Sequence, residues 1–260
     1  MTTVMMPAYG SHATVRESVE SVLAQTESRL EIVVVDDASD EPIAGALGGI
    51  DDPRLRVIRR SRNGGACAAR NDALALARTP FVSQLDSDDV WAPDYLESVL
   101  PHFEDPRIGL VYANVGIRYH PEGREVAIYD PTGHPVDHFP RMTESCPIPS
   151  ATPTYRTSAV RALGGYPAWL PATGEYYLYM RLALAGWRFH YVDRMLATYS
   201  WPEPTRGISF DKAALHREEL RLWISLLARH PRTPGAWRRL RERAGQALER
   251  ERRARGRGVR

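Results

Sequence analysis

The sequence predicts an α/β fold, with a mostly parallel central sheet flanked by helices. Short apolar runs rich in β-branched residues alternate with stretches of helical periodicity in the first half of the chain. Two of these runs end directly in clusters of aspartates. Such alternation is typical of strand–helix–strand units with right-handed crossovers, whose binding residues lie at the carboxyl ends of the strands.

The first half of the chain contains the elements of this sheet in regular order. Strands are expected at Thr3–Met6, Leu30–Val35, Leu55–Ile58, Phe81–Leu85 and Leu110–Tyr112. Helices are expected between them at Ala13–Gln25, Ala66–Ala77 and Pro93–Phe103. The helices are long enough to cross over the sheet between parallel strands.

The second half has a different pattern. The stretch Asn114–Thr154 contains seven prolines and no sustained period, which predicts a loop-rich segment. A helix is expected at Glu175–Ala185, followed by two short strands near Phe189–Val192 and Leu196–Tyr199. Two further helices are expected, an amphipathic one at Asp211–Ala228 and a very basic one at Trp237–Arg255, which together form a helical basic C-terminal extension.

Charge is distributed unevenly along the 260 residues, although the formal net charge is only +2. The segment Arg229–Arg260 holds twelve arginines against three glutamates, whereas the rest of the chain is acidic. Of the 34 basic residues only Lys212 is a lysine, which points to coding bias, so we expect no specific nucleic-acid partner. The basic tail leaves open a peripheral contact with an anionic membrane or another partner, and a homodimer.

The cysteine count and the start of the chain suggest a location. Two cysteines, Cys67 and Cys146, are too few for a disulfide framework or a cysteine-rich zinc site. The first residues lack the basic and apolar regions of a signal peptide, and no stretch has the length of a membrane span. We therefore expect a cytoplasmic protein.

The sharpest local signal is the run from Asp86 to Asp89, which places three carboxylates within four positions after an apolar strand. Carboxylates crowded in this way repel one another, and a hard divalent cation with oxygen ligands would compensate their charge. An alternative is that Asp89 caps the helix that opens near Pro93 while the others are solvated. The residues by themselves leave both interpretations open.

Two other segments could contact a nucleotide. One carboxylate of Asp36 and Asp37 could accept a hydrogen bond from a base or a ribose, although an Asx turn explains the pair as well. The glycines of Asn63–Asn71 open a helix with Arg70 one turn in, which could receive a phosphate. Phosphate-loop, dinucleotide-binding and serine-hydrolase motifs do not occur in the sequence, and the histidines show no metal-ligand spacing.

Taken in order, these motifs resemble the family-2 glycosyltransferases of the GT-A fold. The matching segments are Met6–Tyr9, Ser21–Thr26, Glu31–Ser39, Asn63–Asn71, Leu85–Trp91, Val160–Tyr166 and Glu175–Arg181. The resemblance extends from Thr3 to about Ser200. It implies a metal-dependent, inverting transferase that moves a sugar from a nucleotide diphosphate, most simply a UDP-sugar.

The resemblance also implies roles for individual residues on the donor side. Pro7 and Tyr9 match positions that flank the nucleobase, where the Tyr9 ring can stack. Asp37 matches the residue that receives the N–H of the base, which leaves Asp36 to structure the turn. Arg70 matches a basic residue near the nucleotide.

The resemblance also assigns a role to each residue of the acidic run. Asp86 matches the residue that binds the ribose hydroxyls, with Ser87 beside it in the nucleotide site. Asp88 matches the ligand of Mn²⁺ or Mg²⁺, which bridges the donor diphosphate. Trp91, directly after the run, and Trp201 are expected to line the acceptor side.

The general base of the family matches Glu175. Members usually carry Glu-Asp six and seven residues before an arginine, with the Asp as base. Counting back six positions from Arg181 reaches Glu175, and the position before it is Gly174. The base therefore keeps a carboxylate and gains a methylene, while its usual acidic neighbour is missing. A structural alternative is a glutamate at a helix N-terminus, favoured by the helix dipole.

The resemblance divides the chain into three parts. Residues 1–112 are expected to bind the nucleotide-sugar, residues 113–210 to bind the acceptor, and residues 211–260 to form the extension. Within the extension, the segment Arg229–Arg260 is expected to be dispensable for donor hydrolysis. Saccharide, lipid-linked, natural-product and peptide acceptors all remain open. The alternatives are a sugar-phosphate nucleotidyltransferase and a non-catalytic module that binds anionic partners through its basic tail.

Overall fold

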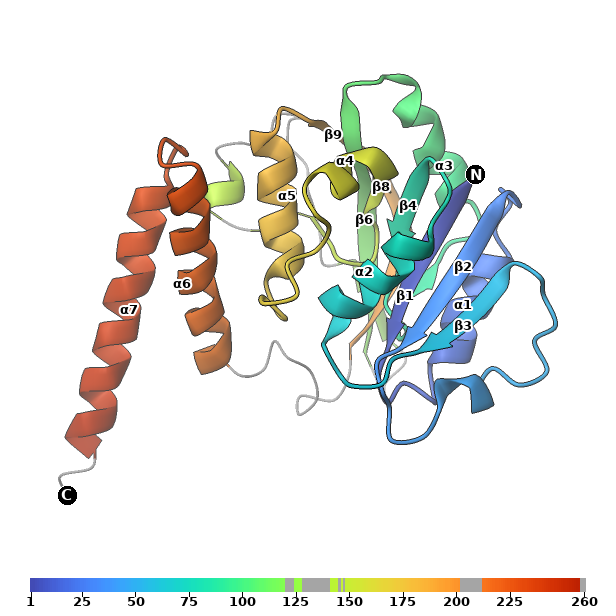
Figure 1. Ribbon diagram of the computed structural model, residues 1–260, viewed down its shortest axis with the longest axis horizontal. Helices are drawn as coiled ribbons and strands as arrows, with labels where there is room; N and C mark the ends of the chain where they lie inside the picture. The colour runs from blue at the N-terminus through green and yellow to red at the C-terminus, as the bar shows by residue number, and fades with distance from the viewer. Residues whose placement is uncertain (120–123, 128–140, 145, 147, 202–211, 258–260) are drawn as a thin grey trace.

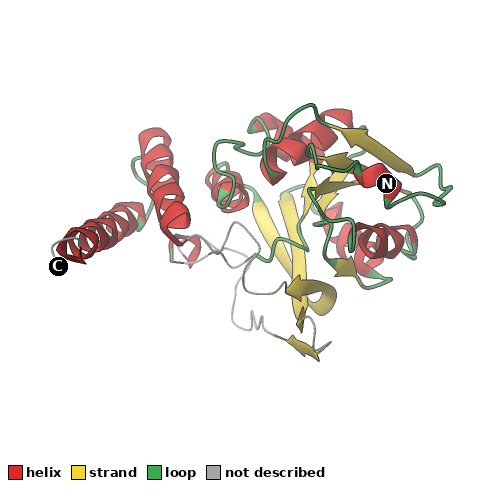
Figure 2. Cartoon of the chain, turned by 90° about the horizontal axis from the view of Figure 1, so that it is seen from below, coloured by secondary structure: helices red, strands yellow, loops and turns green. Residues whose placement is uncertain are grey.

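In the described part of the chain, a mixed sheet of nine strands runs through the molecule, and helices cover both of its faces (Figures 1 and 2). The computed structural model describes residues 1–119, 124–127, 141–144, 146, 148–201 and 212–257. Eight strands are hydrogen-bonded in the order β3-β2-β1-β4-β8-β6-β9-β5, and β7 pairs with β6. The expected α/β architecture is therefore confirmed.

The first four strands of this order are parallel, as the sequence predicts. They are β1 (Thr2–Ala8), β2 (Leu30–Asp36), β3 (Leu55–Arg59) and β4 (Phe81–Gln84). The helices that connect them include α1 (Val15–Leu23) and α2 (Ala66–Leu76). Because β2 and β3 lie on one side of β1 and β4 on the other, the strand order reverses at β1. A crevice at the carboxyl ends of the strands is expected at such a point.

The second half of the sheet is mixed. Its strands are β5 (Val90–Trp91), β6 (Ile108–Tyr119), β7 (Arg124–Ala127), β8 (Thr154–Arg156) and β9 (Arg188–Trp201). Strand β8 is antiparallel to both β4 and β6, whereas β6 and β9 are parallel to each other. Strand β5 pairs antiparallel with β9, and β7 pairs antiparallel with β6.

Two sequence predictions need correction here. The segment Asn114–Thr154 is not loop-rich throughout, because β6 continues to Tyr119 and β7 follows it; residues 128–140 lie outside the described residues. The two short strands expected between residues 189 and 199 are one strand, β9, whose pairing with β6 shifts register near Asn114. These irregularities break the period of both strands, which explains why the pattern concealed them. The predicted boundary after residue 112 falls within β6.

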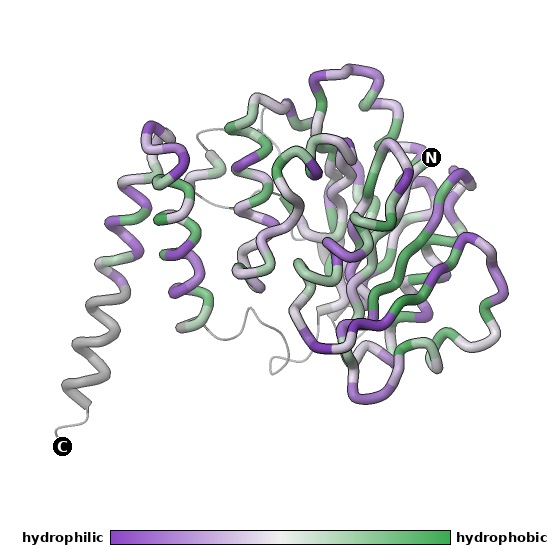
Figure 3. The backbone as a smooth tube through the Cα atoms, viewed as in Figure 1, coloured by the Kyte–Doolittle hydropathy of each residue, from purple (hydrophilic) through white to green (hydrophobic). Residues whose placement is uncertain are grey.

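Each strand of the parallel half sends alternate side chains into two separate cores. On one face Met5 and Val33 pack with residues of α2, of α4 (Thr157–Ala162) and of α5 (Gly174–Leu184). On the other face Val4 and Ile32 pack with residues of α1 and of α3 (Tyr95–Val99). Figure 3 shows the hydrophobic residues gathered along these strands. Both faces of β1 and β2 are buried, which is why these two strands read as continuous apolar runs.

The remaining helices are short or C-terminal. Three 3₁₀ helices lie at Ile43–Gly45, Leu100–Glu104 and Arg141–Thr143. Helices α6 (Lys212–Arg229) and α7 (Ala236–Arg257) lie side by side at the end of the molecule away from β3 (Figure 1). Four residues of α6 join the core that contains α5: Leu222, Trp223, Leu226 and Leu227. Within the described residues, every helix is too short or too polar to cross a bilayer.

Candidate active site

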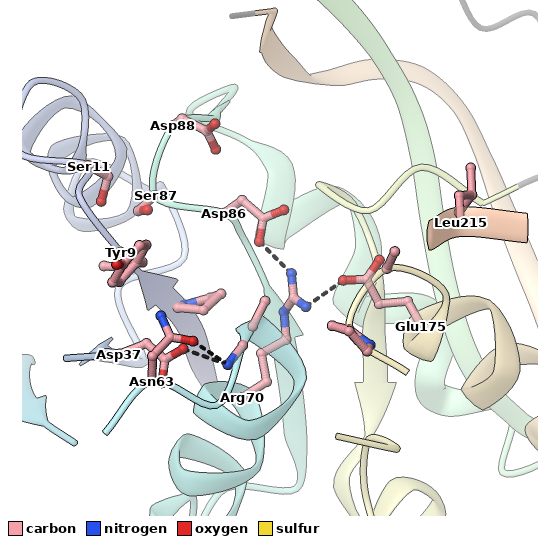
Figure 4. Close-up of a pocket in the computed structure, with 16 residues that line it drawn as sticks. Tyr9, Ser11, Asp37, Asn63, Arg70, Asp86, Ser87, Asp88, Glu175 and Leu215 are labelled. Atoms are coloured by element: carbon pink, nitrogen blue, oxygen red, sulfur yellow. Dashed lines mark hydrogen bonds and ion pairs between the residues drawn. The ribbon is translucent and has the colours of Figure 1, made fainter. Parts of the chain in front are cut away.

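A cavity of about 610 Å³ opens at the carboxyl ends of β1, β2 and β4, where the strand order reverses (Figure 4). All eight site residues predicted from the sequence line it: Pro7, Tyr9, Asp37, Arg70, Asp86, Ser87, Asp88 and Glu175. Asn63, the first residue of the Asn63–Asn71 motif, lines it as well, and so do Ser11 and Leu215, which no motif in the sequence singled out. The volume is in the range of about 300–1,000 Å³ usual for ligand pockets.

The end of β1 supplies the wall nearest the first helix. Tyr9 is 58% exposed, so its ring is available to stack on a flat ligand, whereas Pro7 is buried beneath it. The hydroxyl of Ser11 is buried and has no hydrogen-bond partner within the described residues. A buried hydroxyl of this kind calls for a water or a ligand atom as its partner.

Asp36 holds the turn that follows β2. Its carboxylate accepts hydrogen bonds from the backbone N–H groups of Ser39 (2.9 Å) and Ile43 (3.1 Å) and pairs with Arg59 (3.1 Å). Burial raises the pKa of Asp36, but these bonds outweigh it and the net pKa is lowered. The prediction that Asp36 structures the turn is confirmed.

Asp37 faces the pocket and fixes the loop before α2. Its carboxylate accepts hydrogen bonds from the backbone N–H groups of Gly64 (3.0 Å) and Gly65 (2.7 Å), and Arg60 pairs with it at 2.5 Å. Gly65 has a φ of +81°, a conformation that favours glycine. Asp37 therefore already accepts the hydrogen bonds of both glycine N–H groups, which leaves Arg70 as the phosphate-binding candidate of this segment.

Arg70 joins two carboxylates from distant parts of the chain. Its guanidinium forms ion pairs with Asp86, which follows β4, and with Glu175 in the first turn of α5 (Figure 4). The Arg70 side chain is 1% exposed, whereas those of Asp86 and Glu175 are 29% and 24% exposed. Burial alone would lower the pKa of Arg70, but the two carboxylates more than offset this, so the guanidinium stays charged.

Glu175 lies where acid–base chemistry on a second substrate is feasible. Burial raises its pKa, while Arg70 opposes the rise. Its neighbour Gly174 has no room for a side chain, because a Cβ there would lie 2.5 Å from the Sγ of Cys67. The contact with Cys67 leaves no space for the acidic neighbour of the family pattern, and the charged group beside Glu175 is the cation of Arg70.

The N-terminus of α5 is held from outside by α6. The buried carboxylate of Glu218 accepts hydrogen bonds from the backbone N–H groups of Ala172 (2.9 Å) and Thr173 (3.1 Å), directly before Glu175. Sequence reasoning missed Glu218, because it is one of many charges on an amphipathic helix. Only the docking of α6 gives it this role.

The acidic run from Asp86 to Asp89 lies partly in the pocket, but Asp89 and the following Trp91 do not have the roles that the sequence predicts. Asp88 lies on the exposed side of the pocket and forms no ion pair with any described residue. Asp89 is not a helix cap: it is buried, and its carboxylate accepts a hydrogen bond from Ser200 N–H of β9 at 3.0 Å. Trp91 does not line an acceptor surface, because it is buried, stacks on Tyr95 and donates to the carbonyl of Ala151. The side chain of Trp201 lies outside the described residues.

A metal ion would need ligands beyond the protein. In the described part of the chain, no three His, Cys, Asp or Glu side chains gather as a metal site. Asp88 is an exposed hard oxygen donor beside a second carboxylate; partial desolvation and the charge of Asp86 raise the pKa of Asp88 to about 6. An uncompensated carboxylate fits a cation that takes its remaining ligands from phosphate and water.

Comparison with known proteins gives one answer. The sequence model of glycosyl transferase family 2 matches residues 3–157. The chain is 31% identical over 231 residues to the pre-mycofactocin glycosyltransferase of Mycobacterium tuberculosis, an alignment covering 86% of this chain and 44% of that protein. The chain spans less than half the length of the curated relatives that it matches.

Two solved structures share the fold. S. aureus TarS 1–349 in complex with UDP-GlcNAc superposes with a TM-score of 0.71 at 21% identity, covering 87% of this chain and 66% of that chain. The mannosyltransferase PcManGT from Pyrobaculum calidifontis, in complex with GDP-Man and Mn²⁺, superposes with a TM-score of 0.69 at 20% identity. That match covers 95% of this chain and 68% of PcManGT.

Proposed function

The chain belongs to glycosyl transferase family 2, and we propose that it is a metal-dependent, inverting enzyme that transfers a sugar from a UDP-sugar to an acceptor hydroxyl. One observation carries the proposal: Arg70 ties Asp86 and Glu175 together in a single pocket. The residue assigned to the donor ribose and the residue assigned to the acceptor proton are thus adjacent. Membership in this family decides against nucleotidyl transfer and against a non-catalytic module.

The donor side of the proposal depends on Tyr9, Asp37 and Asp86. Tyr9 offers an exposed ring for the base, and Asp37 is a charged acceptor at the neighbouring strand end. Uracil and guanine each present a ring N–H that a carboxylate can accept, whereas cytosine and adenine do not, so Asp37 favours UDP or GDP over CDP and ADP. TarS, bound to UDP-GlcNAc, supports UDP, while the GDP-Man in PcManGT makes GDP the competitor to test.

Asp88 would hold the divalent cation, Mn²⁺ or Mg²⁺, together with oxygens of the donor diphosphate. Cleavage of a sugar–diphosphate bond develops negative charge on the leaving phosphate, and a bound cation stabilises that charge. The Mn²⁺ in PcManGT supports use of a divalent metal.

Glu175 performs the acid–base step in this proposal. Its carboxylate takes the proton of the acceptor hydroxyl, whose oxygen forms a bond with the anomeric carbon. The bond from that carbon to the diphosphate breaks, and its electron pair leaves with the nucleotide. Arg70, charged and fully buried, holds the Glu175 carboxylate in position. A single displacement inverts the anomeric centre, so an α-linked donor gives a β-linked product.

The surroundings of the enzyme are part of the proposal as well. A cytoplasmic location with peripheral membrane contact would suit a chain whose last 32 residues carry twelve arginines and three glutamates. The three-part division at residues 112 and 210 remains a prediction.

A thermal-shift screen tests the donor assignment directly. UDP, GDP, CDP and ADP are added with and without Mn²⁺, because a ligand that binds the native state raises the melting temperature. We expect the largest shift from UDP with Mn²⁺. A larger shift from GDP would replace the donor assignment, and no shift from any nucleotide would contradict the proposed function.

A further inference from the structure

A second cavity of about 370 Å³ adjoins the donor pocket on the other side of Glu175. Three residues line both cavities: Ala172, Glu175 and Leu215. In Figure 4 Glu175 lies between Arg70 and Leu215, so its carboxylate is close to both spaces. We call the second space the α6–α7 cavity, because helices α6 and α7 supply Leu215, Glu219, Trp223, Arg239 and Arg243 to its wall.

The walls of this cavity are fixed to the rest of the enzyme. Glu218 of α6 binds the backbone just before Glu175, and Trp223 is 2% exposed in the core shared with α5. On α7, Arg239 donates to the carbonyl of Glu144, and Ala236 is fully buried. The first turns of α7 are therefore part of the cavity and not a detached basic tail.

The charges in the cavity wall are nearly balanced. Arg243 pairs with Glu219 at 3.0 Å, and Arg239 pairs with Glu242 at 3.0 Å. Glu144 and Glu175 add two further carboxylates to the lining. Among the described residues, both arginines of the lining already have a carboxylate partner, so the cavity does not favour an anion.

Neutral hydroxyl groups fit the cavity better. A hydroxyl both donates and accepts, so it can bond to carboxylates and to arginines in the same space. The Nε atoms of Arg239 and Arg243 and one oxygen of Glu219 are buried without a hydrogen-bond partner among the described residues. Tyr176 and Trp223 pack edge to face at 6.2 Å beside these groups and add aromatic surface.

We propose that the α6–α7 cavity is the acceptor subsite and binds an uncharged, polyhydroxylated group, such as a sugar residue, with one hydroxyl directed at Glu175. This inference rests on the proposed function, because it takes Glu175 as the base. It also goes beyond the family match, which ends at residue 157, whereas most of the cavity is built by residues after it. Acceptor choice would then be set by the C-terminal helices.

Binding of simple sugars tests the subsite without any turnover. The protein, loaded with UDP and Mn²⁺, is titrated with a panel of neutral methyl hexosides and with the corresponding hexose 6-phosphates, and binding is followed by saturation-transfer NMR. Arg243→Gln should weaken binding of the best neutral glycoside at least tenfold, the loss expected for a charge-assisted hydrogen bond. Arg241→Gln is the matched control, since Arg241 is on the same helix, exposed, and outside the cavity.

Because Arg243→Gln removes the arginine partner of Glu219, the double variant Glu219→Gln/Arg243→Gln provides an uncharged pair for the same titration. Equal binding by wild type and both variants would overturn the subsite, and tighter binding of the phosphates would overturn the neutral class. The proposed function fails by a different result, the absence of any nucleotide binding or nucleotide-sugar turnover in the wild type.

Discussion

Replacing Glu175 tests whether this residue is the general base of the transfer reaction. Glu175→Gln keeps the shape of the side chain but cannot accept a proton. Removal of a positioned general base typically lowers kcat by about 10²–10⁴, which corresponds to roughly 2.7–5.5 kcal/mol of barrier. The protein should still fold, because Arg70 keeps Asp86 as a charged partner when Glu175 is neutralised.

The structure also predicts what should not change. Tyr9, Asp37 and Asp88 belong to other segments and make no contact with Glu175 in the described structure, so the KM for the donor should stay within about twofold of wild type. Glu175→Asp shortens the side chain by one methylene and withdraws the carboxylate from Arg70. A misplacement of about 1 Å can cost about 10²-fold in rate, so this variant should lie between wild type and Glu175→Gln.

The assay is transfer to a glycoside acceptor, with the anomeric configuration of the product read by NMR. The matched control is Glu17→Gln, an exposed glutamate on α1 outside both cavities, which should behave as wild type. Turnover of Glu175→Gln within a few-fold of wild type, or a product with retained configuration, would show that Glu175 is not the base.

Four further substitutions test the residues assigned to the metal, the nucleobase, the positioning of Glu175 and the start of α5. Asp88→Asn should remove the stimulation of transfer by Mn²⁺, and full activity of the wild type in excess EDTA would contradict the metal assignment. Asp37→Asn should narrow the preference for UDP over CDP by about tenfold or more in calorimetry, because cytosine lacks the ring N–H that a carboxylate accepts; an equal loss for both nucleotides would mean that Asp37 only supports its loop. Arg70→Gln removes the charge that lowers the pKa of Glu175, so the acidic limb of the kcat–pH profile should move to higher pH, and an unmoved limb would separate Arg70 from the base. Gly174→Ala should lower the free energy of unfolding by about 1–3 kcal/mol in denaturant titrations, a loss that Cys67→Ala in the same chain should partly restore; additive effects would argue against the contact.

The sequence predicted the parallel half of the fold well, because there local pattern and burial agree. Strands β1 and β2 are buried on both faces and appear as unbroken apolar runs between amphipathic helices. The pattern failed for β6 and β9, where shifts of register interrupt the period. It also missed β8, three residues long, which is defined by its antiparallel pairing and not by its own composition.

The candidate site could be predicted residue by residue but not bond by bond. Motif matching brought Asp37, Asp86 and Glu175 to one pocket, which the structure contains. It could not indicate that Asp37 binds two glycine amides or that Arg70 lies between the other two carboxylates. The Asp37 contacts join the end of β2 to the loop before α2, and the Arg70 contacts join α2 to the end of β4 and to α5. No spacing within a single segment encodes contacts between segments.

Gly174 shows how a departure from a family pattern can have a local steric cause. From the motif alone, glycine at position 174 means that the base has lost its acidic neighbour, which would suggest a weaker enzyme. In the structure, the Sγ of Cys67 fills the space of any side chain at that position, and Arg70, three residues after Cys67 on the same helix, presents its charge to Glu175. Since Cys67 and Arg70 are one turn apart on α2, the same helix face that excludes the usual acidic neighbour places a cation beside Glu175, which lowers the pKa of Glu175 where a carboxylate would raise it. The change at residue 174 is therefore one half of a paired arrangement, and a carboxylate restored there without altering Cys67 would displace the base that it was meant to assist.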